Sequence, residues 1–204
     1  MKKIKISPLC FIWLTLLIQF QGKFFLPLLC AIALHEAGHI LVARALKIKI
    51  KCLRLSMLGA RIETANELSY RDEFLLSAGG PFFGFLGFAF SFPFATRNAS
   101  APFVAEFLLP FAVISFSLTI FNLIPLSTLD GGRMLFCFAC SCFSLDFALK
   151  ILRLSSFFTL FTFWIFTVYL VIKISAGLPM LVFCAIFFSK CFIFNAKNKD
   201  FTSF

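Results

Sequence analysis

The chain has 204 residues, of which 61% are hydrophobic and only 14% are charged, and its mean hydropathy is +0.99. A soluble domain of this length cannot bury so much apolar surface, because its surface-to-volume ratio leaves too many residues facing water. Lipid is therefore the expected solvent. The net charge of +10 does not indicate nucleic-acid binding, since the basic residues separate apolar segments instead of clustering with exposed aromatic residues.

Six apolar segments are predicted to cross the membrane, since a span takes about 20 mostly apolar residues. In chain order they are residues 7–22, 24–46, 73–95, 103–121, 154–172 and 175–194. No polar linker separates a second folded unit, so residues 1–204 are predicted to form a single domain. The expected fold class is an all-α polytopic membrane protein with six transmembrane helices.

The basic residues are distributed unequally between the two sides of these spans. With the N-terminus in the cytoplasm, 16 of the 19 Lys and Arg residues are cytoplasmic, and only Lys23, Arg97 and Lys173 are not. This asymmetry follows the positive-inside rule. We therefore expect an integral, multi-pass membrane protein with both termini in the cytoplasm. The Phe-rich and Lys-rich composition favours a bacterial cell membrane.

Residues 47–64 do not fit a membrane span. The run Lys47-Ile48-Lys49-Ile50-Lys51 alternates polar and apolar residues, which is the period of a β-strand. Residues 58–63 resemble a turn followed by a second short strand. The pattern predicts a small cytoplasmic β-hairpin, and an irregular basic loop beside the membrane is the alternative.

Two histidines and a glutamate lie inside the second predicted span. His35 and His39, the only histidines in the chain, are four residues apart, so a helix places both imidazoles on one face. Imidazole nitrogen binds zinc, and Glu36 can reach water on such an ion without binding it; this is the His-Glu-x-x-His pattern of metalloproteases. Alternatively, the two histidines are buried polar groups bonded between helices. Because such side chains are costly in lipid, the pattern favours a metal site.

A third ligand is predicted at Asp130. A catalytic zinc usually has three protein ligands and leaves its fourth position for water, and no third histidine exists. Pro125 and the pair Gly131-Gly132 break the helix, and irregular backbone at membrane depth is tolerated where it lines a polar cavity. Asp130 at this broken helix can therefore turn toward the metal. The alternative is an Asp that caps a helix at the membrane surface.

These residues resemble the site-2 proteases, the zinc enzymes of intramembrane proteolysis. The resemblance rests on His35-Glu36-Ala37-Gly38-His39 and on Asn122-x-x-Pro125-x-x-x-Leu129-Asp130-Gly131, and it extends from about residue 8 to residue 194. It is nearest to the branch of the stage IV sporulation protein FB proteases, which also have a Gly-Pro element like Ala78-Gly79-Gly80-Pro81. The sequence departs from that branch in two ways. Thr128 stands where relatives often have Pro, and no CBS domain follows the sixth predicted span.

The resemblance implies an intramembrane zinc metalloendopeptidase. The residues it implies are His35, His39 and Asp130 as ligands of Zn²⁺, Glu36 as the catalytic base, and Asn122, Pro125 and Gly131 as supports of the substrate or of the helix break. The expected substrate is a membrane protein or a membrane-associated precursor in the lipid bilayer, and a sporulation sigma-factor precursor is one candidate. A regulatory membrane protein is expected as a further partner.

Two other classes of protein would also explain polar residues buried in helices. A polytopic membrane transporter should show internal repeats with paired broken segments, and the sequence has one clear break. A non-catalytic regulatory scaffold would be expected to lose the catalytic glutamate or a ligand, and all four residues are present.

Overall fold

The computed structural model describes residues 3–6, 22–56, 59–64, 68–98 and 100–174. The predicted span at 175–194, and all but the last residue of the one at 7–22, lie outside the described residues. The chain divides into two compact units, Met1–Asn122 and Leu123–Phe204. The prediction of one domain over the whole chain stays a prediction.

The four other predicted spans are helical, as the sequence indicates. They correspond to α2 (Gly22–Ala45), α3 (Tyr70–Arg97), the π-helix η1 (Val104–Leu108) continuing into α4 (Leu109–Leu123), and α6 (Leu145–Ile174). Four stretches among the described residues are long and apolar enough to cross a membrane: Phe24–Ala45, Tyr70–Arg97, Val104–Leu123 and Leu145–Lys173.

The last of these helices begins well before the predicted residue 154. Its first turns contain Asp146, Lys150 and Arg153, which are compatible with a helix but not with the centre of a bilayer. Hydropathy therefore marks only the apolar part of α6. The start of α3, by contrast, has a local signal, since the Ser69 hydroxyl accepts a hydrogen bond from the Asp72 backbone N–H at 3.1 Å.

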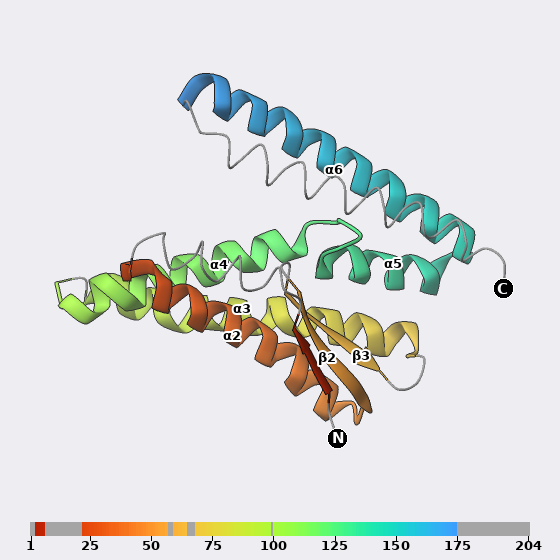
Figure 1. Cartoon of the computed structure of the whole chain (residues 1–204), viewed down its shortest axis with the longest axis horizontal. Coiled ribbons are helices and arrows are strands. Elements are labelled where there is room, and N and C mark those ends of the chain that lie inside the picture. The colour runs from red at the N-terminus through yellow and green to blue at the C-terminus, as the bar shows by residue number, and fades with distance from the viewer. Residues whose placement is uncertain (1–2, 7–21, 57–58, 65–67, 99, 175–204) are drawn as a thin grey trace. The chain divides into compact units, whose positions relative to one another are not determined.

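A small three-stranded sheet accompanies α2 and α3 in the first unit (Figure 1). Strand β2 (Ile50–Ser56) pairs antiparallel with β3 (Gly59–Thr64), within the segment for which the sequence predicts a hairpin. Strand β1 (Lys3–Ile6) pairs parallel with β2 and was not predicted. The alternation of Lys and Ile over residues 3–6 is the signal that could have found it.

Helices α2 and α3 lie side by side because glycines let their backbones meet (Figure 1). A Cβ atom at Gly38 would lie 2.9 Å from the carbonyl carbon of Gly79, and a Cβ atom at Gly79 would lie 2.9 Å from the carbonyl oxygen of Gly38. Small residues are the usual means of close helix approach in membranes, where the hydrophobic effect does not drive helices together. This contact sets the distance between α3 and the histidines of α2.

The second unit begins at the predicted helix break. Residues 124–129 form a loop between α4 and α5 (Asp130–Cys142), so the break is confirmed. A Cβ atom at Gly131 would collide with the carbonyl oxygen of Leu123, and one at Gly132 would collide with that of Leu126. The loop therefore folds closely against the start of α5, and only glycine fits at both positions.

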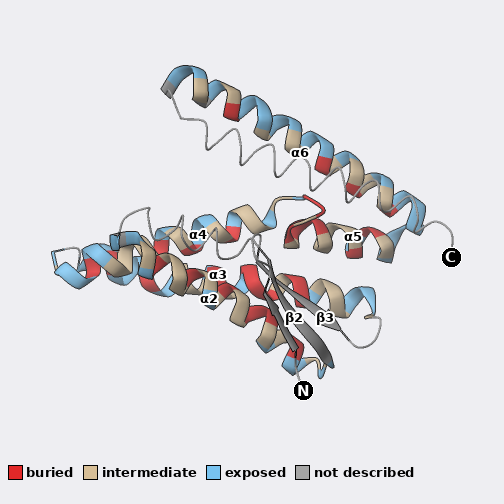
Figure 2. Cartoon of the chain, viewed as in Figure 1, coloured by how far each residue is buried: buried red, intermediate tan, exposed pale blue. Residues whose placement is uncertain are grey.

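A buried hydrogen bond ties the same loop to α6, in which the Ser127 N–H donates to the Ser156 hydroxyl at 3.1 Å. Most of α6 is otherwise exposed, as Figure 2 shows. Of the most apolar stretch of 18 residues in α6, only 12% is buried, compared with 39% of the corresponding stretch in α3. The exposed residues are large and apolar, including Phe157, Phe161 and Trp164, which suits a surface facing lipid.

Candidate metal centre

Helix α2 places both histidines in the interior of the first unit. His35 and His39 are 4% and 8% exposed, and their ring centroids are 5.0 Å apart in an edge-to-face arrangement. One ring nitrogen of His35 lies within 4.8 Å of one ring nitrogen of His39. The spacing of four residues therefore brings the two imidazoles together on one face, as the sequence predicts.

The orientation of the His39 ring is set by a backbone carbonyl of α3. Its Nδ1 lies 2.8 Å from the carbonyl oxygen of Leu76, in a buried hydrogen bond. Because a carbonyl oxygen can only accept, the hydrogen must be on Nδ1. The lone pair of the neutral ring is then on Nε2, which is the state that a metal-binding histidine requires.

The Nε2 atoms of both histidines face the same place on α3. A Cβ atom at Gly80 would lie 2.6 Å from Nε2 of His35 and closer still to Nε2 of His39. Glycine at this position leaves room beside the two nitrogens that any other residue would fill. Two imidazole nitrogens that converge in this way fit a zinc ion.

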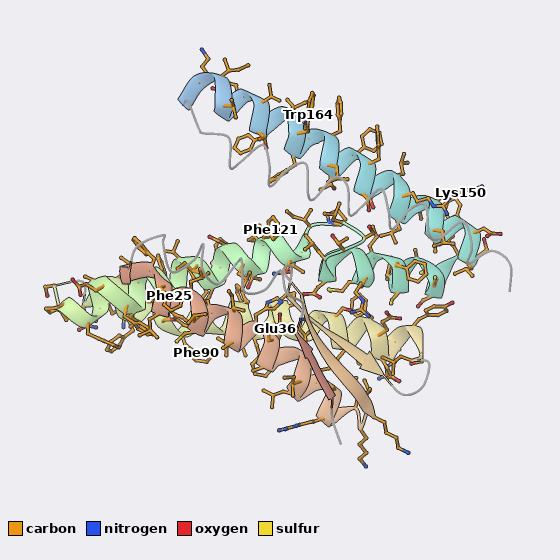
Figure 3. The ribbon with its side chains drawn as sticks, in the orientation of Figure 1. Phe25, Glu36, Phe90, Phe121, Lys150 and Trp164 are labelled. Carbon is orange, nitrogen blue, oxygen red and sulfur yellow. The ribbon has the colours of Figure 1, made fainter. Side chains whose placement is uncertain are left out.

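Glu36 lies between the two histidines on α2, where Figure 3 labels it, and its side chain is half-buried. Successive residues of a helix are about 100° apart around its axis, so Glu36 lies beside the face that carries the imidazoles. A carboxylate in that position can reach a water molecule at the metal without being a ligand itself. This placement is the one that the His-Glu-x-x-His pattern implies.

Asp130 is the first residue of α5, in the second unit, and it is half-buried. The N-cap position is Leu129, whose side chain cannot hydrogen-bond, so Asp130 is not the capping residue of this helix. The alternative of a capping aspartate is therefore wrong. The role of Asp130 as the third metal ligand stays a prediction.

The three supporting residues all lie at or next to the helix break. Asn122 is near the end of α4, and its side-chain N–H donates to the Leu118 carbonyl at 2.9 Å. Pro125 is exposed in the loop, and Gly131 is buried in the first turn of α5. Their roles beside a substrate stay predictions.

Sequence reasoning missed the parts of the centre that come from α3. The Leu76 acceptor is a backbone atom, for which the sequence has no signal. Gly80 was noted only as part of the Gly-Pro element, and its position beside the histidines was not predicted. The paired glycines could have indicated it, because glycines inside a predicted span are unusual unless another backbone or a ligand approaches closely.

The helix break after α4 lies in the part of the chain that matches the model of a known protein family. Residues 88–166 match the model of Peptidase family M50. The match includes Asn122, Pro125 and Asp130. It begins at residue 88, so it does not include the two histidines of α2. No curated protein sequence matches the chain.

A solved structure has the same fold over nearly the whole chain. It is the site-2 protease from Methanocaldococcus jannaschii, with a TM-score of 0.68 and 19% sequence identity, covering 94% of this chain and 90% of that one. At this identity the likeness shows the fold alone. The chain therefore has the fold of that site-2 protease, and its residues 88–166 are similar to Peptidase family M50.

Proposed function

We propose that this chain is an intramembrane zinc metalloprotease, which hydrolyses a peptide bond in or near a membrane-embedded substrate. One observation carries the proposal: the Nε2 atoms of buried His35 and His39 face the same space beside Gly80. These groups lie in a helix apolar enough to cross a membrane, where polar side chains are costly and usually functional. The M50 match over residues 88–166 supports the same reaction class.

The proposed ligands are His35, His39 and Asp130. Two neutral imidazoles and one carboxylate form a donor set typical of catalytic zinc, with a fourth position left for water. Asp130 supplies the negative charge of this set. The glycines that follow it let the loop before α5 fold closely against the start of that helix.

Zinc, when bound, supplies a Lewis acid that lowers the pKa of water to about 7 and polarises the carbonyl of the peptide bond. Glu36 accepts the proton of the attacking water and then delivers it to the leaving amine. Asn122 donates to its own helix, so its side-chain oxygen remains an acceptor for a backbone N–H of the substrate. The substrate must unwind locally, because helical hydrogen bonds shield its carbonyls.

The test compares wild type with Glu36→Gln and His39→Ala after purification in detergent. Zinc is measured by elemental analysis, and cleavage is measured with a quenched fluorescent casein. We expect about one zinc per chain in wild type and in Glu36→Gln, cleavage by wild type only, and loss of zinc in His39→Ala.

Other outcomes would contradict the proposal. Cleavage by Glu36→Gln would remove Glu36 from the role of base. If no form of the protein contained zinc, the protease mechanism would fail. Ion flux through proteoliposomes would then favour a transporter, and substrate binding without turnover would favour a regulatory scaffold.

We further propose that the substrate is a single-span or membrane-associated precursor, with a sporulation sigma-factor precursor as the first candidate. The resemblance of the two motifs to the sporulation branch supports this choice. The Phe-rich and Lys-rich composition supports a bacterial cell membrane, and the distribution of basic residues supports a cytoplasmic position of both termini. A regulatory membrane partner belongs to the same proposal. Co-expression with a tagged precursor tests it, since Glu36→Gln should abolish the shortened product.

A further inference from the structure

A second glycine of α3, Gly84, borders the other nitrogen of His35. A Cβ atom at Gly84 would lie 2.5 Å from the Thr119 hydroxyl oxygen and 3.8 Å from Nδ1 of His35. The hydroxyl and the ring nitrogen therefore share the small space that this glycine leaves. Thr119 is only 3% exposed, so its hydroxyl is inside the first unit.

The hydrogen-bond chemistry of the two groups is complementary. The Thr119 hydroxyl donates to the Ser115 carbonyl at 2.9 Å, and the Pro81 carbonyl is farther away at 3.4 Å. A hydroxyl has one hydrogen, so the oxygen keeps lone pairs with which to accept. His35 faces Gly80 with Nε2, so its Nδ1 carries the hydrogen when the ring binds a metal.

We propose that Thr119 is a positioning residue for the metal ligand His35. Its hydroxyl accepts a hydrogen bond from the His35 Nδ1–H, directly or through one water, and so fixes the ring with Nε2 toward the metal. The Leu76 carbonyl does the same for His39. The inference rests on the proposed zinc site. Hydrogen-bond partners of this kind typically change metal affinity by about 10–100-fold.

The inference also explains why α3 has glycines one turn apart. Gly80 leaves room for the two Nε2 atoms, and Gly84 leaves room for the Thr119 hydroxyl next to Nδ1 of His35. A side chain at Gly84 would push that hydroxyl away. The face of α3 toward the histidines therefore serves both nitrogens of the His35 ring.

The experiment uses Thr119→Val, which keeps the shape of the side chain but removes the hydroxyl, and Thr119→Ser, which keeps the hydroxyl. Ser115→Ala is the matched control. This serine lies one turn earlier in α4 and is 1% exposed, and its hydroxyl has no hydrogen-bond partner among the described residues. The readouts are the zinc dissociation constant from chelator competition, the visible spectrum of the Co²⁺-loaded protein, and the melting temperature without metal.

We expect Thr119→Val to weaken zinc binding about 10-fold and to alter the Co²⁺ spectrum. Thr119→Ser and Ser115→Ala should match wild type in zinc affinity and in the Co²⁺ spectrum. If Thr119→Val does not fold, Thr119→Ala replaces it with the same expectation. Unchanged zinc affinity in Thr119→Val would overturn the inference, and so would an equal loss in Thr119→Ser, because packing and not the hydroxyl would then be the cause.

The zinc site itself is tested in the same series. If wild type bound no zinc, or if His35→Ala bound it as tightly as wild type, the proposed zinc site would fail and the inference with it. A wild type that binds zinc through His35 but tolerates Thr119→Val would contradict the positioning role alone.

Discussion

Nδ1 of His39 lies 2.8 Å from the backbone carbonyl oxygen of Leu76, so one helix of the first unit orients a histidine of another. No side-chain substitution at Leu76 can remove this acceptor. What can move it is the packing of α2 against α3, which depends on the backbone contact between Gly38 and Gly79. The geometry of the candidate metal centre is therefore coupled to a helix crossing made of glycines.

This coupling predicts the effect of Gly38→Ala. The new methyl group would meet the backbone of Gly79 and Cβ of Phe83 at 2.9 Å, atoms that cannot move without the helix. We expect α3 to shift, the melting temperature to fall by an amount equivalent to about 1–3 kcal/mol, and zinc affinity to fall as well. Gly22→Ala is the control in the same helix, because nothing lies within 4 Å of its new methyl group. Equal behaviour of the two variants would contradict the prediction.

Gly80→Ala should lose zinc with a smaller loss of stability than Gly38→Ala. The new methyl group meets ring nitrogens at the ends of His35 and His39, which can rotate away without moving a helix. Rotation of His39 breaks its hydrogen bond to the Leu76 carbonyl, at a cost of about 1 kcal/mol. We expect elemental analysis to show zinc in wild type and little in Gly80→Ala, and the metal-free variant to melt between wild type and Gly38→Ala. Gly87→Ala in the same helix is the control, since its methyl group would meet the flexible end of Leu34 and should leave zinc in place. Retention of zinc by Gly80→Ala would place the ion elsewhere.

The features that the sequence predicts correctly are those specified by neighbouring residues. A spacing of four residues is enough to bring His35 and His39 together on one helix face. Pro125 and the glycines after Asp130 are enough to predict the break between α4 and α5. Four of the six predicted spans also coincide with helices that are long and apolar enough to cross a membrane, because hydropathy over about 20 residues reflects the composition that a span requires.

The features that the sequence does not predict depend on segments far apart in the chain. The parallel pairing of β1 with β2 joins residues about 50 positions apart, and no local pattern encodes it. The hydrogen bond from His39 to Leu76 and the approach of Thr119 to Gly84 depend on how helices pack. Packing of this kind is decided by the shapes of whole helix faces, which a motif of five residues does not contain.

The hydrogen bond from Ser127 to Ser156 predicts a stability effect in the second unit. Ser156→Ala would leave the buried Ser127 N–H without its acceptor, at a cost of about 1–3 kcal/mol. The neighbouring Ser155→Ala is the control, because the Ser155 hydroxyl donates to a carbonyl of its own helix, that of Leu152. We expect thermal unfolding in detergent to show a clear loss for Ser156→Ala and a small one for Ser155→Ala. If the two losses were equal, the loop would not depend on this bond.

Asp130→Ala separates a metal ligand from an acidic residue that merely favours the start of a helix. An aspartate in the first turn of α5 stabilises the helix through its macrodipole by about 0.3–1 kcal/mol, whether or not metal is present. A ligand adds a term that appears only with zinc, about 2.7 kcal/mol when free zinc is 100 times the dissociation constant of wild type. We therefore expect metal-free wild type and Asp130→Ala to melt at similar temperatures, and excess zinc to stabilise wild type far more than the variant. Asp146→Ala removes an acidic residue from the first turn of α6 and is the control. It should lose only the small macrodipole contribution, and zinc should stabilise it as much as wild type. Equal stabilisation of wild type and Asp130→Ala by zinc would leave the ion on the histidines and require a different third ligand.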